Sequence, residues 1–241
     1  MSTRGKLLLS LLGLALAIGV MAKDKPWTEW TVKDAQKILS DSGWAQTQTY
    51  MSTTEMTFSP ATRQTDGKGE VNQATGVNYR IRFLSAKPIR QAFLRLAQLD
   101  PKSTHEQTDQ LLQFVDTKYD KIVVIAVSYD QDGLPKDSRF TMPVFQSFSG
   151  GLTSTMKFNA YLDIKGGQRV FLQEYRAPSG DGMGAIFIFP RMVNDKPLLD
   201  PKSGEVRFYA EFPKLGGNDQ QIRLNVRFKV SELMYDGILD Y

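Results

Sequence analysis

The amino-acid sequence predicts an α+β fold: an antiparallel β-sandwich-like core with an N-terminal helix and an inserted helical hairpin. Three observations lead to this prediction. A capped helical pattern begins near residue 31, and two more amphipathic helical patterns follow one another between residues 86 and 119. From about residue 139 onward, short apolar segments are separated by glycine- and proline-containing turns, which is typical of antiparallel strands.

The first residues predict export. Arg4 and Lys6 precede a 14-residue apolar stretch from Leu7 to Val20, and the small residue Ala22 follows. This order is typical of a secretory signal peptide. The stretch is short beside the roughly 20 apolar residues of a membrane-spanning helix, so we expect cleavage rather than retention as an anchor. The prediction is a signal peptide at residues 1–22 and a single α+β domain at residues 23–241. The protein would then reach the periplasm or the extracellular space without a stable membrane span.

Composition excludes several classes of function. The 30 Lys and Arg residues exceed the 26 Asp and Glu residues by only four, and two of these cations lie in the predicted signal peptide. A nearly neutral chain argues against a nucleic-acid-binding protein, which would carry a strong basic excess. The chain has no cysteine, which excludes disulfides, thiolate metal sites and thiol catalysis.

All three tryptophans lie between residues 27 and 44. The helix there is expected to begin after Thr31, with Asp34 completing a capping box. Trp30 precedes the cap and should pack on the first turn of the helix. Trp44 should pack against the last turn.

Two further residues of this segment are Gly43, at the expected end of the helix, and Trp27, before its start. Gly43 fits the left-handed residue that ends many helices. Trp27 lies outside the capping pattern. It could stack on a sugar ring or cover the other end of the helix, and we favour the structural role.

Elements of both kinds follow in order. Residues 47–58 could form a strand, and a polar, glycine-bearing loop follows. Residues 77–85 alternate with Tyr79, Ile81 and Phe83 on one face, as in a half-buried strand. Residues 86–99 predict the first helix of the hairpin, and Ser103 or Thr104 should begin the second. The continuous apolar run at residues 121–129 predicts a central strand that is buried on both faces.

The remaining segments predict an all-β half. The candidate strands are Arg139–Phe145, Ser154–Ile164, Arg169–Tyr175, Gly184–Phe189, Val206–Phe212 and Ile222–Val230. The clearest hairpin turns at residues 165–168. If Ile164 pairs with Arg169, then Leu162 faces Phe171 and Phe158 faces Tyr175.

No motif predicts catalysis, a cofactor or a metal site. The single histidine, His105, is expected to be a solvated residue at the start of a helix, and no G-x-S-x-G nucleophile motif is present. The segment from Ser128 to Arg139 has the aspartates and glycine of half an EF-hand loop, but arginine stands where the bidentate glutamate belongs. The glycines at 180, 182 and 184 precede a predicted strand, whereas a dinucleotide loop precedes a helix.

Basic residues on the predicted strands are the most informative polar feature. They alternate with apolar residues and are Arg80, Arg82, Arg207, Arg223, Arg227 and Lys229. If these strands share one sheet, its outer face is basic and could bind an anionic polymer or a lipid head group. An ordinary solvated face would have the same pattern and would also discourage edge-to-edge pairing. The candidate ligand-binding residues are Trp27, Arg80, Arg82, Arg223 and Arg227.

Four motifs also carry a resemblance to known sequences. They are W-T-E-W at residues 27–30, the D-A-x-x-I-L-x-x-S-x-W-A helix from residue 34, R-F-x-S-A-K-P-I-R from residue 82, and the C-terminal RFKVSELMYDGILDY. With these motifs the chain resembles an uncharacterised family of exported bacterial proteins, chiefly from acidobacteria. The resemblance implies export, and it implies no activity and no binding residues.

Two functional hypotheses follow. The first is a non-enzymatic exported protein that binds or scaffolds a component of the cell envelope, with an envelope glycan, an anionic lipid or a partner protein as its ligand. The second is an acid/base hydrolase whose two carboxylates come together only in the fold. Its candidates include Glu174 and Glu211 within predicted strands and Asp163 beside a turn. A pocket with two close carboxylates would favour the second hypothesis.

Overall fold

The computed structural model describes residues 25–52, 75–132, 138–213 and 221–241. The predicted signal peptide and the part of the predicted strand beyond residue 52 lie outside these ranges. Within them the chain forms five α-helices and 13 strands, and every strand pair is antiparallel. This confirms the predicted α+β class with a sandwich-like core.

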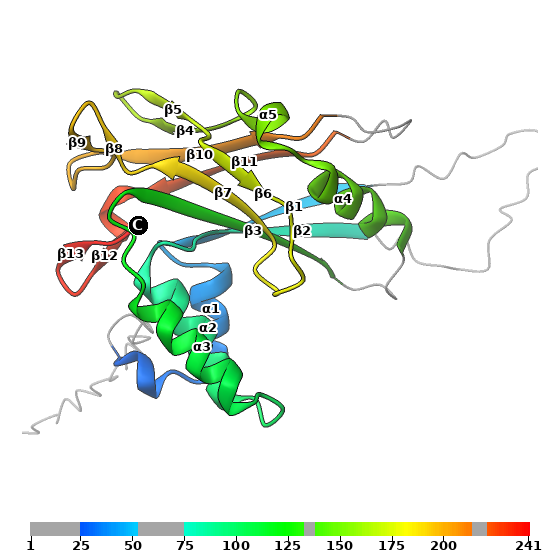
Figure 1. Cartoon of the computed structure of the whole chain (residues 1–241), viewed down its shortest axis with the longest axis vertical. Coiled ribbons are helices and arrows are strands. Elements are labelled where there is room, and N and C mark those ends of the chain that lie inside the picture. Colours follow the sequence, from blue (N-terminus) through cyan, green and yellow to red (C-terminus); the bar gives the residue numbers. More distant parts are fainter. Residues whose placement is uncertain (1–24, 53–74, 133–137, 214–220) are drawn as a thin grey trace, which may run out of the picture.

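The elements form three layers, with helices below, a five-stranded sheet in the middle and a four-stranded sheet above (Figure 1). The five-stranded sheet has the order β1 (Ala45–Ser52), β2 (Thr75–Phe83), β3 (Ile122–Asp132), β7 (Ala185–Pro190) and β6 (Glu174–Arg176). The four-stranded sheet has the order β11 (Arg223–Lys229), β10 (Glu205–Glu211), β4 (Ala160–Ile164) and β5 (Arg169–Phe171). Two short hairpins complete the strands, β8 (Met192–Val193) with β9 (Lys196–Pro197) and β12 (Met234–Tyr235) with β13 (Ile238–Leu239).

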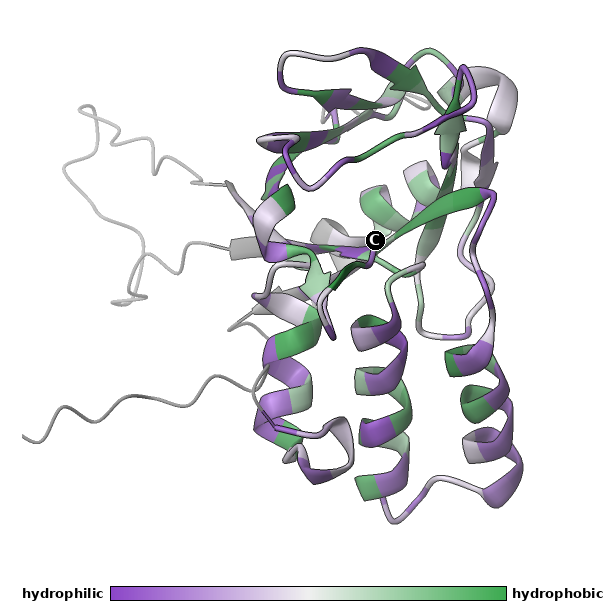
Figure 2. Cartoon of the chain, turned by 90° about the vertical axis from the view of Figure 1, so that its left-hand side faces the viewer, coloured by the Kyte–Doolittle hydropathy of each residue, from purple (hydrophilic) through white to green (hydrophobic). Residues whose placement is uncertain are grey.

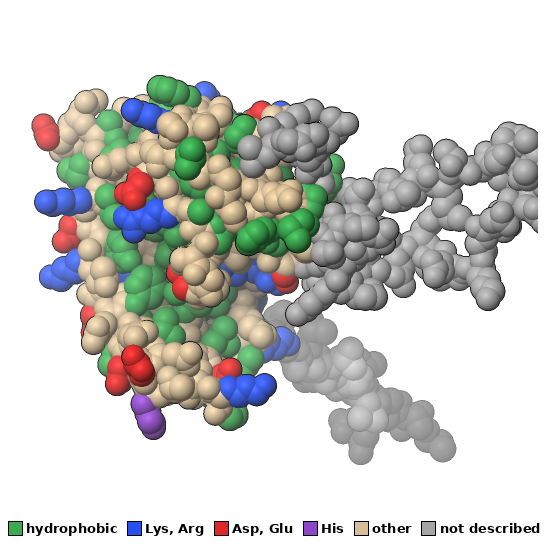
Figure 3. Space-filling model, turned by 45° about the vertical axis from the view of Figure 1, so that its right-hand side comes forward, with side chains coloured by type: hydrophobic (Ala, Val, Ile, Leu, Met, Phe, Trp, Pro, Cys, Tyr) green, Lys and Arg blue, Asp and Glu red, His purple; other side chains and the backbone are tan. Residues whose placement is uncertain are grey.

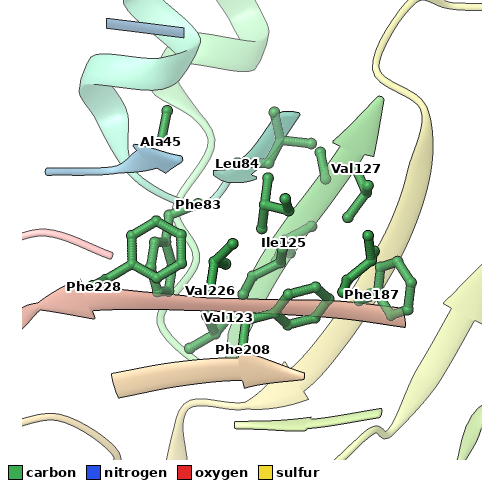
Figure 4. Packing of buried hydrophobic residues seen from close by; sticks show 14 of the residues in the cluster. Ala45, Phe83, Leu84, Val123, Ile125, Val127, Phe187, Phe208, Val226 and Phe228 are labelled. Carbon is green, nitrogen blue, oxygen red and sulfur yellow. The ribbon is translucent and has the colours of Figure 1, made fainter. Parts of the chain in front are cut away.

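The hydrophobic core fills the space between the two sheets (Figure 4) and extends to buried residues of two helices, such as Ile38 and Ile89. Phe83 of the middle sheet meets Phe228 of the upper sheet edge-on, with ring centroids 4.8 Å apart. Phe187 and Phe208 meet in the same way at 5.2 Å. The predicted central strand is confirmed, since β3 occupies the third of five positions and Ile125 beside these rings is completely buried.

The layer below consists of α1 (Val32–Ser40), α2 (Lys87–Leu99) and α3 (His105–Asp116), which lie side by side (Figures 1 and 2). Hydrophobic and hydrophilic residues alternate along each of them, as amphipathic helices require (Figure 2). The predicted hairpin is therefore α2 and α3. Its second helix begins with a capping box between Thr104 and Gln107, as expected.

One buried arginine joins the two helices of the hairpin. Arg90 of α2 is 4% exposed, and its guanidinium lies 4.8 Å from the centroid of the Tyr119 ring. It donates hydrogen bonds to four backbone oxygens, which belong to Leu84, Ser85, Val115 and Thr117. It forms no ion pair with any residue in the described ranges. Arg90 therefore supplies hydrogen-bond donors both to the backbone oxygens of the turn before α2 and to those at the C-terminal end of α3.

The N-terminal helix has the predicted cap. Thr31 accepts a hydrogen bond from the Asp34 amide at 3.2 Å, and Asp34 accepts one from the Thr31 amide at 3.0 Å. Trp30 and Trp44 are 1% and 2% exposed and belong to the core. The Trp44 indole N–H donates to the Asp240 backbone oxygen at 2.8 Å, which ties the start of the described chain to its end.

Gly43 does not have the predicted role of a left-handed residue that ends the helix. The helix ends at Ser40 with Asp41 as its C-cap, and Gly43 does not adopt a left-handed conformation. A Cβ atom at Gly43 would lie 2.2 Å from the backbone oxygen of Glu232. Glycine is required here because another backbone segment passes too close for any side chain.

We expect Gly43→Ala to lower the free energy of unfolding by about 1–3 kcal/mol, because a backbone segment must move to admit the methyl group. Urea unfolding monitored by tryptophan fluorescence measures this change. Gly204→Ala is the matched control, since the nearest atom to its Cβ is a flexible Lys165 carbon at 3.8 Å. Equal stability of the two variants would contradict the steric explanation.

The segment predicted as the strand Arg139–Phe145 is instead a helix, α4 (Ser138–Gly150). Its buried residues Val144, Ser147 and Phe148 follow helical spacing. Pro143 within the segment also disfavours a strand. Phe148 closes one end of the sandwich by stacking on Phe212, with ring centroids 4.7 Å apart.

The predicted hairpin at residues 165–168 is present, but the predicted register is shifted by one residue. Asp163, not Ile164, pairs with Arg169, so Tyr161 faces Phe171. The predicted strand from Ser154 begins instead with a short helix, α5 (Thr153–Met156), and becomes extended only at β4. Tyr175 belongs to β6 in the other sheet, so it does not face Phe158.

The two sheets are joined differently at their two edges. At one edge the chain passes directly from β5 to β6: the Leu172 amide donates to Ala160 in the upper sheet, and the next amide, of Gln173, donates to Ile188 in the middle sheet. At the other edge the Gln48 side chain of β1 bridges to β11. Its amide nitrogen donates to the Arg223 oxygen at 2.9 Å, and its oxygen accepts from the Asn225 amide at 2.8 Å.

Candidate functional site

The predicted ligand-binding residues fall in three separate places. Trp27 lies in a 3-10 turn, η2 (Trp27–Glu29), where it is half-buried and packs against the core. Its place beside the core agrees with the structural role that we favoured.

Arg80 and Arg82 of β2 lie in the middle sheet and point toward the helical layer. Arg80 forms an ion pair with Asp130 at 2.7 Å. Arg82 is 5% exposed and donates to the Leu39 oxygen at 2.6 Å and to the Ser128 hydroxyl at 2.8 Å. Burial lowers the pKa of Arg82 to about 10. These two arginines therefore do not share a face with Arg223 and Arg227.

Arg223 and Arg227 lie on the solvent-facing side of the four-stranded sheet, which we call the outer face. The register of the strands aligns two sets of side chains there in rows across the sheet. The charged row consists of Arg227, Arg207, Asp163 and Arg169, and the aromatic row consists of Tyr209, Tyr161 and Phe171. Because side chains alternate between the faces of a sheet, both rows point to solvent while their neighbours enter the core.

Asp163 organises the charged row. Its Oδ2 atom lies 2.7 Å from Nη2 of Arg207 and 3.6 Å from Nη2 of Arg169. Arg169 also stacks over the Tyr161 ring, 4.0 Å from its centroid. Arg227 at the end of the row is exposed and forms no ion pair with any residue that the structure describes.

An open hollow of about 350 Å³ lies at this end of the charged row. Five charged side chains line it, and they are Asp163, Lys165, Glu205, Arg207 and Arg227. Three are cationic and two are acidic, so the hollow is a mixed site with a cationic excess. We call it the charged hollow.

The aromatic row is packed but open at its margin. Tyr161 and Tyr209 stack with their ring centroids 4.8 Å apart and their planes 17° apart. Phe171 meets Tyr161 edge-on and is 42% exposed, and Phe158 beyond it is 70% exposed. The row therefore ends in two exposed apolar rings.

A polar cluster around Glu211 borders the aromatic row on the side away from the charged row. Glu211 accepts hydrogen bonds from the Tyr209 hydroxyl and the Gln221 amide, and it pairs with Arg223 at 3.2 Å. Desolvation raises the pKa of Tyr209, and the bond to Glu211 adds to this rise. The charge of Glu211 raises the pKa of Arg223. Arg223 is thus already paired, in contrast to Arg227.

Of the three acidic residues named from the sequence only Asp163 lines the charged hollow, and its acidic neighbour there, Glu205, was not among them. Asp163 and Glu205 line the same hollow, so two carboxylates do share a cleft. Glu174 lies in the other sheet, where it pairs with Arg176 at 2.7 Å. Glu211 lies on the outer face but does not line the charged hollow.

Metal and histidine chemistry receive no support from the described residues. No group of three acidic or histidine side chains in those ranges could hold a metal ion. His105 is the first residue of α3 and is exposed at the lower end of the molecule (Figure 3). The EF-hand-like segment is extended from Ser128 to Asp132, as part of β3, and its next five residues lie outside the described ranges.

Most residues of this site were not predicted from the sequence. Only Arg207, Arg223, Arg227 and Lys229 were predicted on this face, while Arg169, Lys165 and the aromatic row were not. The alternation within β4 and β10 already separates Tyr161 and Tyr209 from their buried neighbours. With the correct register of the hairpin, Tyr161 would have been aligned with Phe171 and the row found.

Comparison of the chain with protein families, with curated proteins and with solved structures finds no match. None of the helices in the described ranges has the length and apolarity to cross a membrane.

Proposed function

We propose that this protein is a non-enzymatic, exported binding protein that holds an anionic component of the cell envelope on the outer face of its four-stranded sheet. The observation that supports this most is Arg227. It is an exposed guanidinium without an acidic partner in the described structure, and it stands beside a hollow with a cationic excess. Such a group is ready to receive a carboxylate or phosphate in a charge-assisted hydrogen bond.

The rest of the charged row supports binding because its groups are already held in place. Asp163 fixes Arg207, and the Tyr161 ring fixes Arg169. Side chains that are ordered before binding lose less conformational entropy when the ligand arrives. A flat, pre-ordered face suits an extended ligand better than it suits the enclosure of a reacting group.

We expect Arg227→Ala to weaken binding of a polyanion about tenfold, since a hydrogen bond to a charged group contributes about 1.5–3 kcal/mol. Purified protein would be titrated with three anionic probes: polygalacturonate, polyphosphate and vesicles containing phosphatidylglycerol. Binding should weaken as salt rises. The matched control is Arg176→Ala, which removes an exposed arginine from β6 in the other sheet.

If none of the three probes binds, or if Arg227→Ala and Arg176→Ala bind them equally well, the proposed function is wrong.

A hydrolase remains a second candidate because Asp163 and Glu205 line one hollow. Glycoside hydrolysis needs two carboxyl groups that face the bond between them, and the Asp163 carboxylate instead points at Arg207 and Arg169. We therefore expect no reducing sugar to be released from polygalacturonate above the buffer rate. Release that disappears in Glu205→Gln would establish hydrolysis and contradict the non-enzymatic assignment.

A further inference from the structure

We infer that the ligand is an acidic polysaccharide, a chain of sugar rings with spaced carboxylates, that lies across the strands along the charged row. This inference rests on the proposed function and names the class of ligand. The row crosses four strands, and at the usual strand spacing it extends over about 14 Å. An extended row favours a polymer over a single small anion.

The signs of the charges argue for a polymer of low charge density. Asp163 stands between Arg207 and Arg169 in the charged row. Glu205 lines the hollow together with three cationic side chains. A polyanion whose charges follow one another closely, such as polyphosphate, would bring charges against these carboxylates and be repelled. A glycan presents hydroxyl groups between its carboxylates, and hydroxyls can donate hydrogen bonds to Asp163 and Glu205.

The type of cation points to an oxyanion that accepts two hydrogen bonds at once. Arg169, Arg207 and Arg227 present planar guanidinium groups, which match a carboxylate or a phosphate with two parallel hydrogen bonds, and of these two groups the carboxylate is the one that a sugar ring carries with hydroxyls beside it. Lysine, whose ammonium acts as a point charge, contributes only Lys165 to the hollow. The site therefore favours ligands whose anionic group accepts two hydrogen bonds from one guanidinium group.

The end of the aromatic row suits a sugar ring. Phe171 shares the exposed face of β5 with Arg169, and the exposed Phe158 meets Phe171 edge-on. The C–H-lined face of a sugar ring is apolar, and it can pack on an aromatic ring while its edge keeps its hydrogen bonds. An aromatic surface and an arginine side by side can thus engage one acidic sugar at two points.

The charged hollow also disfavours a lipid. All five of its lining side chains are charged, so it suits a charged head group better than an acyl chain. A lipid could use the site only through its head group.

The test compares polygalacturonate with its methyl-esterified form, polyphosphate and phosphatidylglycerol vesicles, at one ionic strength. We expect polygalacturonate to bind, and methyl esterification to reduce its affinity at least tenfold. Arg207→Ala with Arg227→Ala should abolish that binding, and Phe171→Ala should weaken it severalfold without changing binding to polyphosphate. Arg176→Ala is the control. Circular dichroism confirms that each variant is folded.

Two results would overturn the inference while the proposed function stands. One is tighter binding of polyphosphate or vesicles than of polygalacturonate, still dependent on Arg207 and Arg227. The other is equal binding of the acid and its methyl ester while polyphosphate or the vesicles still bind in a way that depends on Arg227. Absence of Arg227-dependent binding to any of the anionic probes would instead remove the proposed function itself, so the two failures are distinguishable.

Discussion

Arg90→Met is expected to lower the free energy of unfolding by about 3–5 kcal/mol, because breaking a buried network of a charged group is among the most destabilising single changes. Methionine fills much of the space but donates no hydrogen bond. The four backbone oxygens that accept hydrogen bonds from Arg90 would lose this donor. An unsatisfied buried polar group costs about 1–3 kcal/mol by itself.

Two further variants identify the cause of that loss. Arg90→Lys keeps the charge, but an ammonium cannot reproduce the fork that reaches the turn before α2 and the end of α3 together. We expect it to recover only a minor part of the stability. Arg176→Met makes the same substitution at an exposed arginine and should change stability by less than about 0.5 kcal/mol. Urea unfolding of all three gives the comparison, and an Arg90→Met value within about 1 kcal/mol of wild type would contradict the assigned role.

Trp44→Ala is expected to lower the free energy of unfolding by about 3–5 kcal/mol, as large-to-small changes of buried aromatic residues do. The indole is 2% exposed and meets Tyr235 edge-on, with ring centroids 6.1 Å apart. Its removal leaves a cavity and also takes the donor from the Asp240 oxygen. Thermal and urea unfolding measure the loss.

Trp27→Ala is the matched control for Trp44→Ala. It removes the same side chain from the same segment, but from a half-buried position. We expect a clearly smaller loss, and acrylamide quenching should show that the fluorescence of Trp27 is the most accessible of the three. Equal losses in the two variants would mean that the helix is not held mainly by Trp44.

Local signals predicted the parts of the fold that depend on neighbours in the sequence. The cap at Thr31 and Asp34 formed as expected because both of its hydrogen bonds lie within four residues. The alternation from Ile222 to Val230 predicted β11 for the same reason. The prediction for Arg139–Phe145 was wrong because seven residues with alternating apolar character fit a strand. Pro143 was a local signal against the strand, and burial of Val144 and Phe148 against other elements selects the helix.

The candidate site depends on contacts that lie far apart in the sequence, so it was predicted only in part. Arg80 and Arg82 show the same alternation as Arg223 and Arg227, and nothing local distinguishes the two pairs. The helical layer buries Arg82, Arg80 pairs with Asp130 on the same face, and solvent faces Arg223 and Arg227. This difference arises from the order of the strands. The aromatic row was missed because a register one residue off moves every cross-strand pair.

The unequal edges of the sandwich also bear on how the protein can associate with itself. At one edge the chain itself connects the two sheets through Leu172 and Gln173. At the opposite edge the side-chain amide of Gln48 makes the hydrogen bonds that the described structure shows between β1 and β11. Fluctuations that separate the sheets would therefore start at Gln48. If the Gln48 side chain releases these two hydrogen bonds, the Asn225 amide and the Arg223 backbone oxygen can pair with a strand of a second molecule. The side-chain amide of Gln48 thus occupies the hydrogen-bonding groups that a further strand would use at this edge.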